Sequence, residues 1–567
     1  MSKILPKHTE CDVVVIGSGA GGLSTAVTAG KCGLDVVVIE KESLFGGTTA
    51  FSGGVLWVPG THHDTARGID DSKDKARQYL QNETGAYYDA KAIDRYLDTG
   101  PDAIDFLEKQ TEVRFIPSLY PDYHPTVPGG LELGRALTAA PYDASRLGSN
   151  LKRLRPPLQT ITFMGMMFNS SNSEIEHFFN ATRSMKSAFY VTKRLLSHFG
   201  EVLKFGRGVQ VTSGNALTAR LAKSVFDLDI PIYTDTPARK MLMESGRVCG
   251  VELGGENEGT TIRARKGVVL ACGGFPHDIK RITQAYPHLQ RGGEHFSPVP
   301  DCNTGDGIQL GEEAGGHFDI RLANAAAWMP VSKVKTGNGQ FTAFPHLLDR
   351  YKPGVIGVLR NGKRFTNESE SYHDVGAAMI ESCKDQKETA AWLICDHPTI
   401  RKYGLGYVKP TPVPLGSHLS SGYLLRGNSL KELASAAGID AEALQQTVDT
   451  YNKDARNGQD PAFGRGTTAF NRYLADAKHK PNPCVAPIET GPFYAVKIMM
   501  GDLGTFDGLT TNVDGQVLTA DGSTVEGLYA VGNDRASIMG GNYPGAGITL
   551  GPAVVFGYTT ARHIAAQ

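Results

Sequence analysis

Short runs of β-branched residues alternate with a glycine turn and a helical stretch near the start of the chain. Residues 12–16 and 35–39 both have the sequence DVVVI, a pattern typical of parallel strands that are covered on both faces. Residues 23–31 lie between them and can form a helix. The order strand, turn, helix, strand predicts a βαβ unit, and the expected fold class is α/β with a Rossmann-like sheet.

The turn between the first strand and the helix has the spacing GxGxxG at Gly17, Gly19 and Gly22. Glycines there let the backbone approach a pyrophosphate, which the N-terminus of the helix stabilises. Glu40 ends the second strand 18 residues after Gly22, at the spacing of an acid that holds a ribose hydroxyl. A glycine-rich turn of some other α/β protein is the alternative, but the strand, helix and acid around this turn favour a dinucleotide.

The end of the chain places glycines and a proline around one tyrosine, in GGNYPGAGITLG at residues 540–551. Pro544 fixes a turn, and a helix can begin near Ile548 with the positive end of its dipole toward whatever precedes it. The Tyr543 hydroxyl and the Gly547 N–H are two donors on this turn. Two such donors can converge on a substrate carbonyl as an oxyanion hole, and a polarised ketone has acidified α-hydrogens.

Length and charge limit the classes of protein that need to be considered. The 567 residues exceed one ordinary domain and predict two to four folding units. An apolar share of 40% with 21% charged residues is typical of a globular protein. The formal net charge of −1 creates no field that would attract nucleic acid, so no nucleic-acid partner is expected.

The cysteines and the N-terminus indicate the compartment. The eight cysteines form no CxxC pair, so neither a zinc nor an iron–sulfur site is predicted. A strand begins within about a dozen residues of the N-terminus without a signal-peptide apolar region, and no run of 18 or more apolar residues occurs. A cytoplasmic protein with reduced thiols is therefore expected.

Three further segments distinguish FAD from NAD. Residues 44–59, LFGGTTAFSGGVLWVP, form a second glycine-rich loop directly after the ribose acid; residues 263–275 and 527–534 have the sequences RARKGVVLACGGF and GLYAVGND. In this order the segments resemble flavoproteins of the fumarate reductase and succinate dehydrogenase superfamily. The resemblance implies that the second loop lies against the isoalloxazine, that residues 263–275 return to the FAD domain after a β-meander, and that residues 527–534 reach the ribityl chain.

The resemblance assigns FAD binding to residues of all these segments and of the C-terminal turn. They are Gly17, Gly19, Ala20, Gly21, Gly22, Glu40, Lys41, Gly47, Thr48, Thr49, Ser52, Gly53, Gly54, Ala271, Gly273, Asn533, Asp534, Ile548 and Leu550.

Two features of the sequence concern how FAD is attached and reoxidised. Superfamily members that attach FAD through histidine carry that residue at about the place of Gly47, so the resemblance implies non-covalent FAD. No second GxGxxG follows a strand, which predicts that no nicotinamide domain is present. Electrons would then leave to a diffusing acceptor such as a quinone.

The FAD motifs lie at both ends of the chain, so the FAD-binding domain must be discontinuous. We expect it to comprise residues 1–330 and 490–567, with an α+β catalytic domain at 331–489 that binds substrate. A polar helix is expected over residues 428–452 of this insert. Active sites often form at such a junction between domains.

Three tyrosine motifs make the resemblance more specific, to 3-ketosteroid Δ1-dehydrogenases, over nearly the whole chain. That family has a C-terminal Tyr-Pro-Gly-x-Gly motif, matched by Tyr543 to Gly547, whose tyrosine and last glycine bind the C3 carbonyl. Its base for the C2 proton is a tyrosine after Arg-Phe-x-Asn-Glu, matched by Tyr372. A third tyrosine, matched by Tyr123 in SLYPDYHP, assists that base. The resemblance implies FAD-dependent 1,2-desaturation of a 3-ketosteroid, with the C1 hydride passing to the flavin.

The chemistry of tyrosine agrees with these roles. A free tyrosine has a pKa of about 10, so a base at Tyr372 needs a neighbour that favours its phenolate, and Tyr123 could donate a hydrogen bond to it. Tyr120, three residues earlier, competes with Tyr123 but is expected to be a wall of the pocket. His62 and His63 are interpreted as structural.

Several alternatives remain open at this point. A 3-ketosteroid Δ4-(5α)-dehydrogenase shares the fold and the ketone activation. A fumarate reductase would need an arginine and histidines that the C-terminal motif lacks, and the apolar Phe163, Met164, Met166 and Met167 suit a steroid better than a dianion. The alternative outside the enzymes is a protein that binds flavin or is recruited to membranes without catalysing a reaction.

Residues 157–205 combine large apolar residues with Arg183, Lys186, Lys193, Arg194 and Lys204. A basic amphipathic helix of this kind can lie in a membrane interface, which would make the protein a peripheral membrane protein. More often such a helix covers a core or lines an apolar pocket. Both interpretations stay open.

Overall fold

The computed structural model describes residues 8–163, 165–167, 177–178, 184–337 and 339–567. Its largest sheet has the strand order β18-β19-β11-β1-β2-β8, with parallel pairing from β19 through β8. The strands are β1 (His8–Ile16), β2 (Val36–Ile39), β8 (Ile232–Tyr233), β11 (Thr261–Leu270), β18 (Gln516–Leu518) and β19 (Thr524–Ala530). The antiparallel strands β9 (Ala238–Glu244) and β10 (Arg247–Leu253) lead into β11. The predicted α/β class with a Rossmann-like sheet is confirmed.

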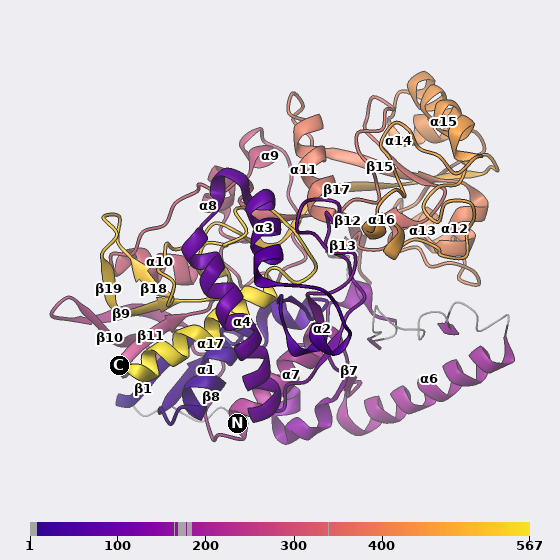
Figure 1. Ribbon diagram of the computed structural model, residues 1–567. Helices are drawn as coiled ribbons and strands as arrows, with labels where there is room; N and C mark the ends of the chain where they lie inside the picture. Colours follow the sequence, from indigo (N-terminus) through magenta and orange to yellow (C-terminus); the bar gives the residue numbers. More distant parts are fainter. Residues whose placement is uncertain (1–7, 164, 168–176, 179–183, 338) are drawn as a thin grey trace.

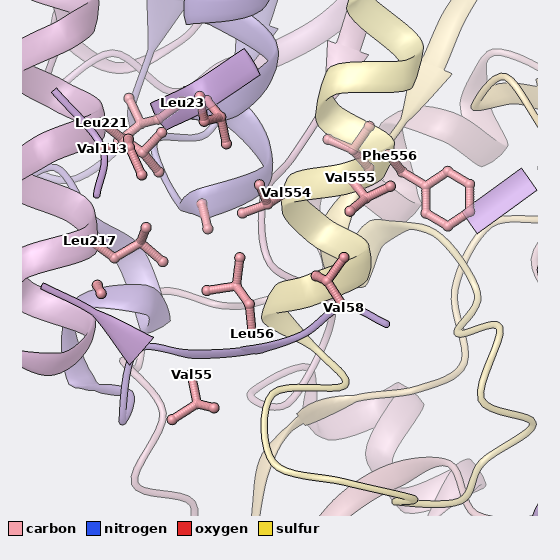
Figure 2. Packing of buried hydrophobic residues seen from close by; sticks show 14 of the residues in the cluster. Leu23, Val55, Leu56, Val58, Val113, Leu217, Leu221, Val554, Val555 and Phe556 are labelled. Atoms are coloured by element: carbon pink, nitrogen blue, oxygen red, sulfur yellow. The ribbon is translucent and has the colours of Figure 1, made fainter. Parts of the chain in front are cut away.

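The first and last helices pack together over this sheet (Figure 1). They are α1 (Ala20–Lys31) and α17 (Leu550–Ala566). Figure 2 shows Leu23 of α1 near Val554 of α17, and both side chains are fully buried. Full burial of one such side chain stabilises the fold by about 1.5–3 kcal/mol. The two ends of the chain therefore share one core, as the positions of the FAD motifs predicted.

A second, antiparallel sheet has the strand order β13-β12-β17-β15-β14, with β16 beside β17. Its strands are β12 (Ala326–Lys335), β13 (Phe341–Pro345), β14 (Val355–Val358), β15 (Ala390–Cys395), β16 (Leu425–Gly427) and β17 (Phe493–Thr505). The sheet thus draws on residues slightly before and after 331–489, and these domain boundaries stay a prediction.

The polar helix predicted over residues 428–452 is wrong as a single element. The structure has two helices there, α14 (Leu430–Ala437) and α15 (Ala441–Ala455). Gly438 is left-handed with φ of 68°, which ends α14, and the Asp440 carboxylate caps α15 by accepting the N–H groups of residues 442 and 443.

A small sheet and several helices complete the fold. A three-stranded sheet in the order β3-β5-β4 frames the loop of residues 118–135; its strands are β3 (Val55–Trp57), β4 (Phe115–Pro117) and β5 (Ala136–Ala139). Helix α7 (Ser213–Phe226) packs against β5, α3 (Lys73–Thr84) packs against α4 (Ala90–Gln110), and α11 (Tyr372–Ser382) packs against β12. Helix α6 (Met185–Phe205) extends away from the body of the molecule (Figure 1).

Candidate active site

Three tyrosines from distant segments form one buried cluster. Tyr123 lies in the loop 118–135, Tyr372 is the first residue of α11, and Tyr543 lies in the turn before α17. The Tyr123 hydroxyl donates to the Tyr372 hydroxyl at 3.4 Å. Ring centroids of Tyr543 lie 5.6 Å from Tyr123 and 5.1 Å from Tyr372. The structure thus brings together the tyrosines that the sequence motifs singled out, and each is at most 9% exposed.

The turn that carries Tyr543 is held by its neighbours on both sides. The Pro544 carbonyl accepts the Tyr123 N–H at 2.9 Å and the Tyr79 hydroxyl at 2.6 Å. Gly547 has φ of +97°, and a Cβ there would lie 2.4 Å from the Val55 carbonyl oxygen. Only glycine fits at this position because the backbone is left-handed and packed directly on β3. Helix α17 begins at Leu550, two residues later than Ile548.

Burial governs the protonation of the cluster. It raises the pKa of Tyr372 and of Tyr123 well above the ordinary value, and it raises that of Tyr543 as well. All three phenols are therefore neutral at neutral pH. The neutral Tyr543 can donate a hydrogen bond. Tyr372 can act as a base only after its own hydroxyl proton has been transferred to another group.

Several neighbours of the cluster were not identified from sequence. Phe470 lies 4.4 Å from Tyr123 between ring centroids, and Phe506 lies 6.1 Å from Tyr543. His373 is buried 5.9 Å from the Tyr543 ring, and its Nδ1 accepts the N–H of Trp328. Burial lowers the pKa of His373 to about 4, so this imidazole is neutral. In the sequence, only the position of His373 directly after Tyr372 could have indicated that it belongs to the site. Phe470 and Phe506 lie in no motif.

Two other expectations concern Tyr120 and the methionines of residues 164–167. Tyr120 is partly exposed and lies 4.5 Å from Tyr473 between ring centroids. The described residues Met166 and Met167 line a cavity of about 220 Å³ together with Val202 of α6. None of the three clustered tyrosines lines that cavity. Met164 lies outside the described residues.

The GxGxxG turn has the close packing that requires glycine. Gly17 has φ of +107°, and a Cβ there would lie 2.2 Å from the Ala271 carbonyl oxygen. A Cβ at Gly22 would lie 2.1 Å from the Gly17 carbonyl oxygen. Helix α1 begins directly after Gly19 without a side-chain cap. Apart from the Ala20 N–H, which Thr49 Oγ1 accepts, the N–H groups of the first turn can therefore meet an anionic group such as a pyrophosphate.

The second glycine loop faces this turn. Thr49 Oγ1 accepts the Ala20 N–H at 2.9 Å. A Cβ added at Gly19, Gly47 or Gly53 would have no heavy atom closer than 3.6 Å, so the backbone of both loops borders open space. The GxGxxG turn and the loop 46–54 together form a surface without side chains at these glycines, here called the cradle, which fits an extended dinucleotide.

The other predicted FAD residues lie around this cradle. Glu40 accepts hydrogen bonds from the N–H and hydroxyl of Ser18, and Asp534 accepts the N–H groups of Cys272 and Gly274. Burial raises the pKa of Asp534 to about 6. Lys41 instead pairs with Asp306 at 2.6 Å. For the others, contact with FAD stays a prediction: Gly21, Thr48, Ser52, Gly54, Gly273, Asn533, Ile548 and Leu550.

Asn303 was not identified from sequence. Its side-chain amide donates to Thr48 Oγ1 at 2.9 Å and to the Gly273 carbonyl at 3.1 Å. It therefore joins the second glycine loop to the end of β11. No motif marks this residue, so the sequence offered no signal for it.

Residues 12–550 match the protein family described as FAD binding domain, and the chain belongs to this family and is an FAD-dependent oxidoreductase. It is related over nearly its whole length to dehydrogenases of oxo compounds. A 4-oxocyclohex-2-ene-1-carboxylate 5-dehydrogenase of Sinomonas cyclohexanicum is 41% identical, over 99% of this chain and 94% of the relative. A 3-oxosteroid 1-dehydrogenase of Mycolicibacterium smegmatis is 37% identical, over 98% of this chain and 97% of the relative.

A solved structure extends the similarity to three dimensions. The crystal structure of 3-ketosteroid delta1-dehydrogenase from Sterolibacterium denitrificans in complex with 1,4-androstadiene-3,17-dione matches with a TM-score of 0.88 and 33% identity. The match covers 98% of this chain and all of that one. The predictions of FAD as cofactor and of an FAD-dependent enzyme are confirmed.

Proposed function

We propose that this enzyme introduces a 1,2 double bond into 3-ketosteroids. The observation that carries the proposal is the tyrosine cluster, in which Tyr123 and Tyr372 share a hydrogen bond beside Tyr543. The Tyr543 hydroxyl and the Gly547 N–H would bind the C3 carbonyl and stabilise the negative charge that develops on its oxygen. Removal of a C2 proton then becomes easier.

Tyr372 would take that C2 proton. Because burial keeps Tyr372 neutral, its proton must first be lost; the hydrogen bond donated by Tyr123 would then stabilise the phenolate. The cluster is buried, which excludes water and strengthens these interactions. Bound FAD supplies the acceptor for the two electrons and the hydrogen that leave C1. The GxGxxG turn, Glu40 and the loop 46–54 would hold it.

The test is anaerobic mixing of the flavin-loaded enzyme with androst-4-ene-3,17-dione. We expect rapid loss of the visible flavin absorbance and a product with a new 1,2 double bond. In a parallel assay with 5α-androstane-3,17-dione, which is saturated at C4 and C5, a new double bond between these two carbons would instead indicate the Δ4 reaction. A flavin that stays oxidised with a panel of 3-ketosteroids would disprove the proposal.

A second candidate substrate is 4-oxocyclohex-2-ene-1-carboxylate. The observation that favours it is the 41% identity to a dehydrogenase of this acid over 99% of the chain. It is also a six-membered ring ketone, so the same carbonyl donors and base could act on it. In the same assay, bleaching by this acid without bleaching by any steroid would replace the steroid proposal and leave the roles of the tyrosines in place.

We expect FAD to be bound without a covalent bond. Gly47 has no side chain that could be attached to the flavin, and it lies against the GxGxxG turn. Precipitation of the yellow protein with trichloroacetic acid should release all flavin into the supernatant. Flavin that stays with the pellet would contradict this expectation.

We also expect a quinone, and not a nicotinamide, to reoxidise the enzyme. The sequence has one GxGxxG turn after a strand, which the FAD site uses. Anaerobically reduced enzyme should regain its visible absorbance when a soluble quinone such as menadione is added, and should stay colourless with NAD⁺ or NADP⁺. Equal reoxidation by NAD⁺ would contradict the prediction.

Helix α6 is proposed to contact an anionic membrane surface. Met185, Phe189, Leu196 and Leu203 are between 68% and 91% exposed, which is unusual for large apolar side chains on one helix. Exposed lysines such as Lys186 on the same helix complement anionic headgroups. No helix in the described part of the chain is long and apolar enough to cross a membrane.

Vesicle sedimentation tests this contact. The enzyme should sediment with phosphatidylglycerol vesicles, weakly with phosphatidylcholine vesicles, and less at high salt. Replacement of Phe189 and Leu196 by serine should abolish sedimentation, whereas the same change at the exposed Ile279 and Phe341 should not. If both double variants sediment like the parent enzyme, α6 is not the contact.

A further inference from the structure

His124 connects the two segments that carry Tyr123 and Tyr372. It directly follows Tyr123, and its ring lies between two carboxylates. His124 Nδ1 is 2.8 Å from Glu83 Oε2 on α3, and Nε2 is 3.1 Å from Asp374 Oδ2 in the first turn of α11. One imidazole thus joins the loop 118–135 to the helix that begins at Tyr372.

The geometry requires that His124 is a cation. Both ring nitrogens face carboxylate oxygens, and a neutral imidazole has only one N–H to donate. Burial would lower the pKa of His124, but the hydrogen bonds to Asp374 and Glu83 raise it to about 11. The carboxylates are a matched pair of acceptors for two N–H donors, and charge-assisted bonds of this kind are among the stronger ones in proteins.

The Asp374 carboxylate also fixes the start of α11. Its Oδ2 accepts the Ser371 hydroxyl at 2.5 Å, and Ser371 Oγ in turn accepts the Asp374 N–H at 3.1 Å as the N-cap. On the other side, the His124 N–H donates to the Tyr79 hydroxyl at 3.2 Å, which itself donates to the Pro544 carbonyl. His124 therefore lies in a continuous set of hydrogen bonds that reaches all three tyrosine segments.

The hydroxyl pair is sensitive to small movements of these segments. Its oxygens are 3.4 Å apart, whereas O–H···O bonds are usually about 2.5–3.0 Å long. A further separation of a few tenths of an ångström would end the contact. The His124–Asp374 bond joins the Tyr123 loop to the first turn of α11 beside the hydroxyl pair, so loss of this bond is expected to change the hydroxyl separation.

We propose that His124 is a positioning residue, which as a cation bonded to Glu83 and Asp374 holds the Tyr123 and Tyr372 hydroxyls within hydrogen-bond distance. This inference rests on the proposed function, in which Tyr123 assists Tyr372. His124 itself contacts neither reacting atoms nor cofactor in this role.

The test compares His124→Gln with the parent enzyme and with His62→Gln. His62 is a matched control because its two ring nitrogens also lie near carboxylates, those of Asp105 and Glu108, on the surface. We expect His124→Gln to lower kcat at least tenfold, to leave KM and bound FAD per chain within twofold, and to shift the rise of kcat to higher pH. His62→Gln should change none of these.

A double-mutant cycle and a crystal structure complete the test. Asp374→Asn should reproduce the loss, and the His124→Gln/Asp374→Asn variant should be no worse than either single variant, because all three remove one bridge. Asp374→Asn also serves if His124→Gln does not fold. In the crystal structure of whichever variant folds, the Tyr123–Tyr372 hydroxyl separation should exceed 3.5 Å.

The outcomes separate the two proposals. Unchanged kcat together with an unchanged hydroxyl separation would overturn the role of His124 while the proposed function stands. If the parent enzyme itself reduces its flavin with neither ketone, the proposed function fails. The hydroxyl separation in the variant structure then still decides whether His124 holds the two segments together.

Discussion

Replacing Tyr543 by phenylalanine is expected to lower kcat by about 10²–10³-fold, because loss of one oxyanion donor typically costs about 2.7–4 kcal/mol of barrier. The change removes only the hydroxyl. The ring that packs against Tyr123, Tyr372 and Phe506 is retained, so the fold and the bound FAD should be unaffected. Steady-state kinetics with androst-4-ene-3,17-dione and a soluble quinone measure the effect.

The control for this variant is Tyr87→Phe. Tyr87 is 43% exposed and lies outside the cluster, so this change should leave kcat and KM within twofold of the parent values. If Tyr543→Phe behaves in the same way as Tyr87→Phe, the Tyr543 hydroxyl does not bind the carbonyl, and the donors must be sought elsewhere on the turn.

Replacing Tyr372 by phenylalanine is expected to have a comparable or larger effect, about 10²–10⁴-fold on kcat, the range typical of general acid–base catalysis. The phenolate is the active form of this base. Since burial raises the pKa of Tyr372, the active fraction and kcat of the parent enzyme should rise as the pH increases through the alkaline range.

Solvent exchange separates the role of Tyr372 from that of Tyr543. In D₂O the parent enzyme should exchange the C2 hydrogen of the substrate, and Tyr372→Phe should abolish this exchange and the alkaline rise together. Tyr543→Phe should slow the exchange but keep the pH dependence. Continued exchange at the parent rate in Tyr372→Phe would show that another group removes the proton.

The comparison of sequence and structure shows which information is local. The GxGxxG turn and the Tyr543 turn could both be located from the sequence, because their glycines are closely spaced and Gly17 and Gly547 have left-handed φ values that favour glycine. The carbonyls on which these two glycines pack, those of Ala271 and Val55, are distant in the sequence. The helix over 428–452 was predicted with the wrong continuity. Its apolar pattern persists through the break, and the cap at Asp440 outweighs it.

The composition of the site beyond its motifs could not be predicted. None of three residues of the site belongs to a motif: Phe470 lies on the short helix α16 (Ala469–Tyr473), Phe506 directly follows β17, and Asn303 lies in a loop. Their positions depend on how the second sheet packs against the FAD-binding part. The spacing of residues along the chain does not predict that packing.

The sequence by itself located the GxGxxG turn, the α/β class and the turn with Tyr543 and Gly547, because glycine spacing and the apolar pattern of strands and helices are visible within short segments. Only the tertiary structure decided that Tyr123 and Tyr372, which are 249 residues apart, share a hydrogen bond, and that His124 lies between the elements that carry them. The physical reason is that such contacts depend on the packing of whole elements, to which every buried residue of the core contributes.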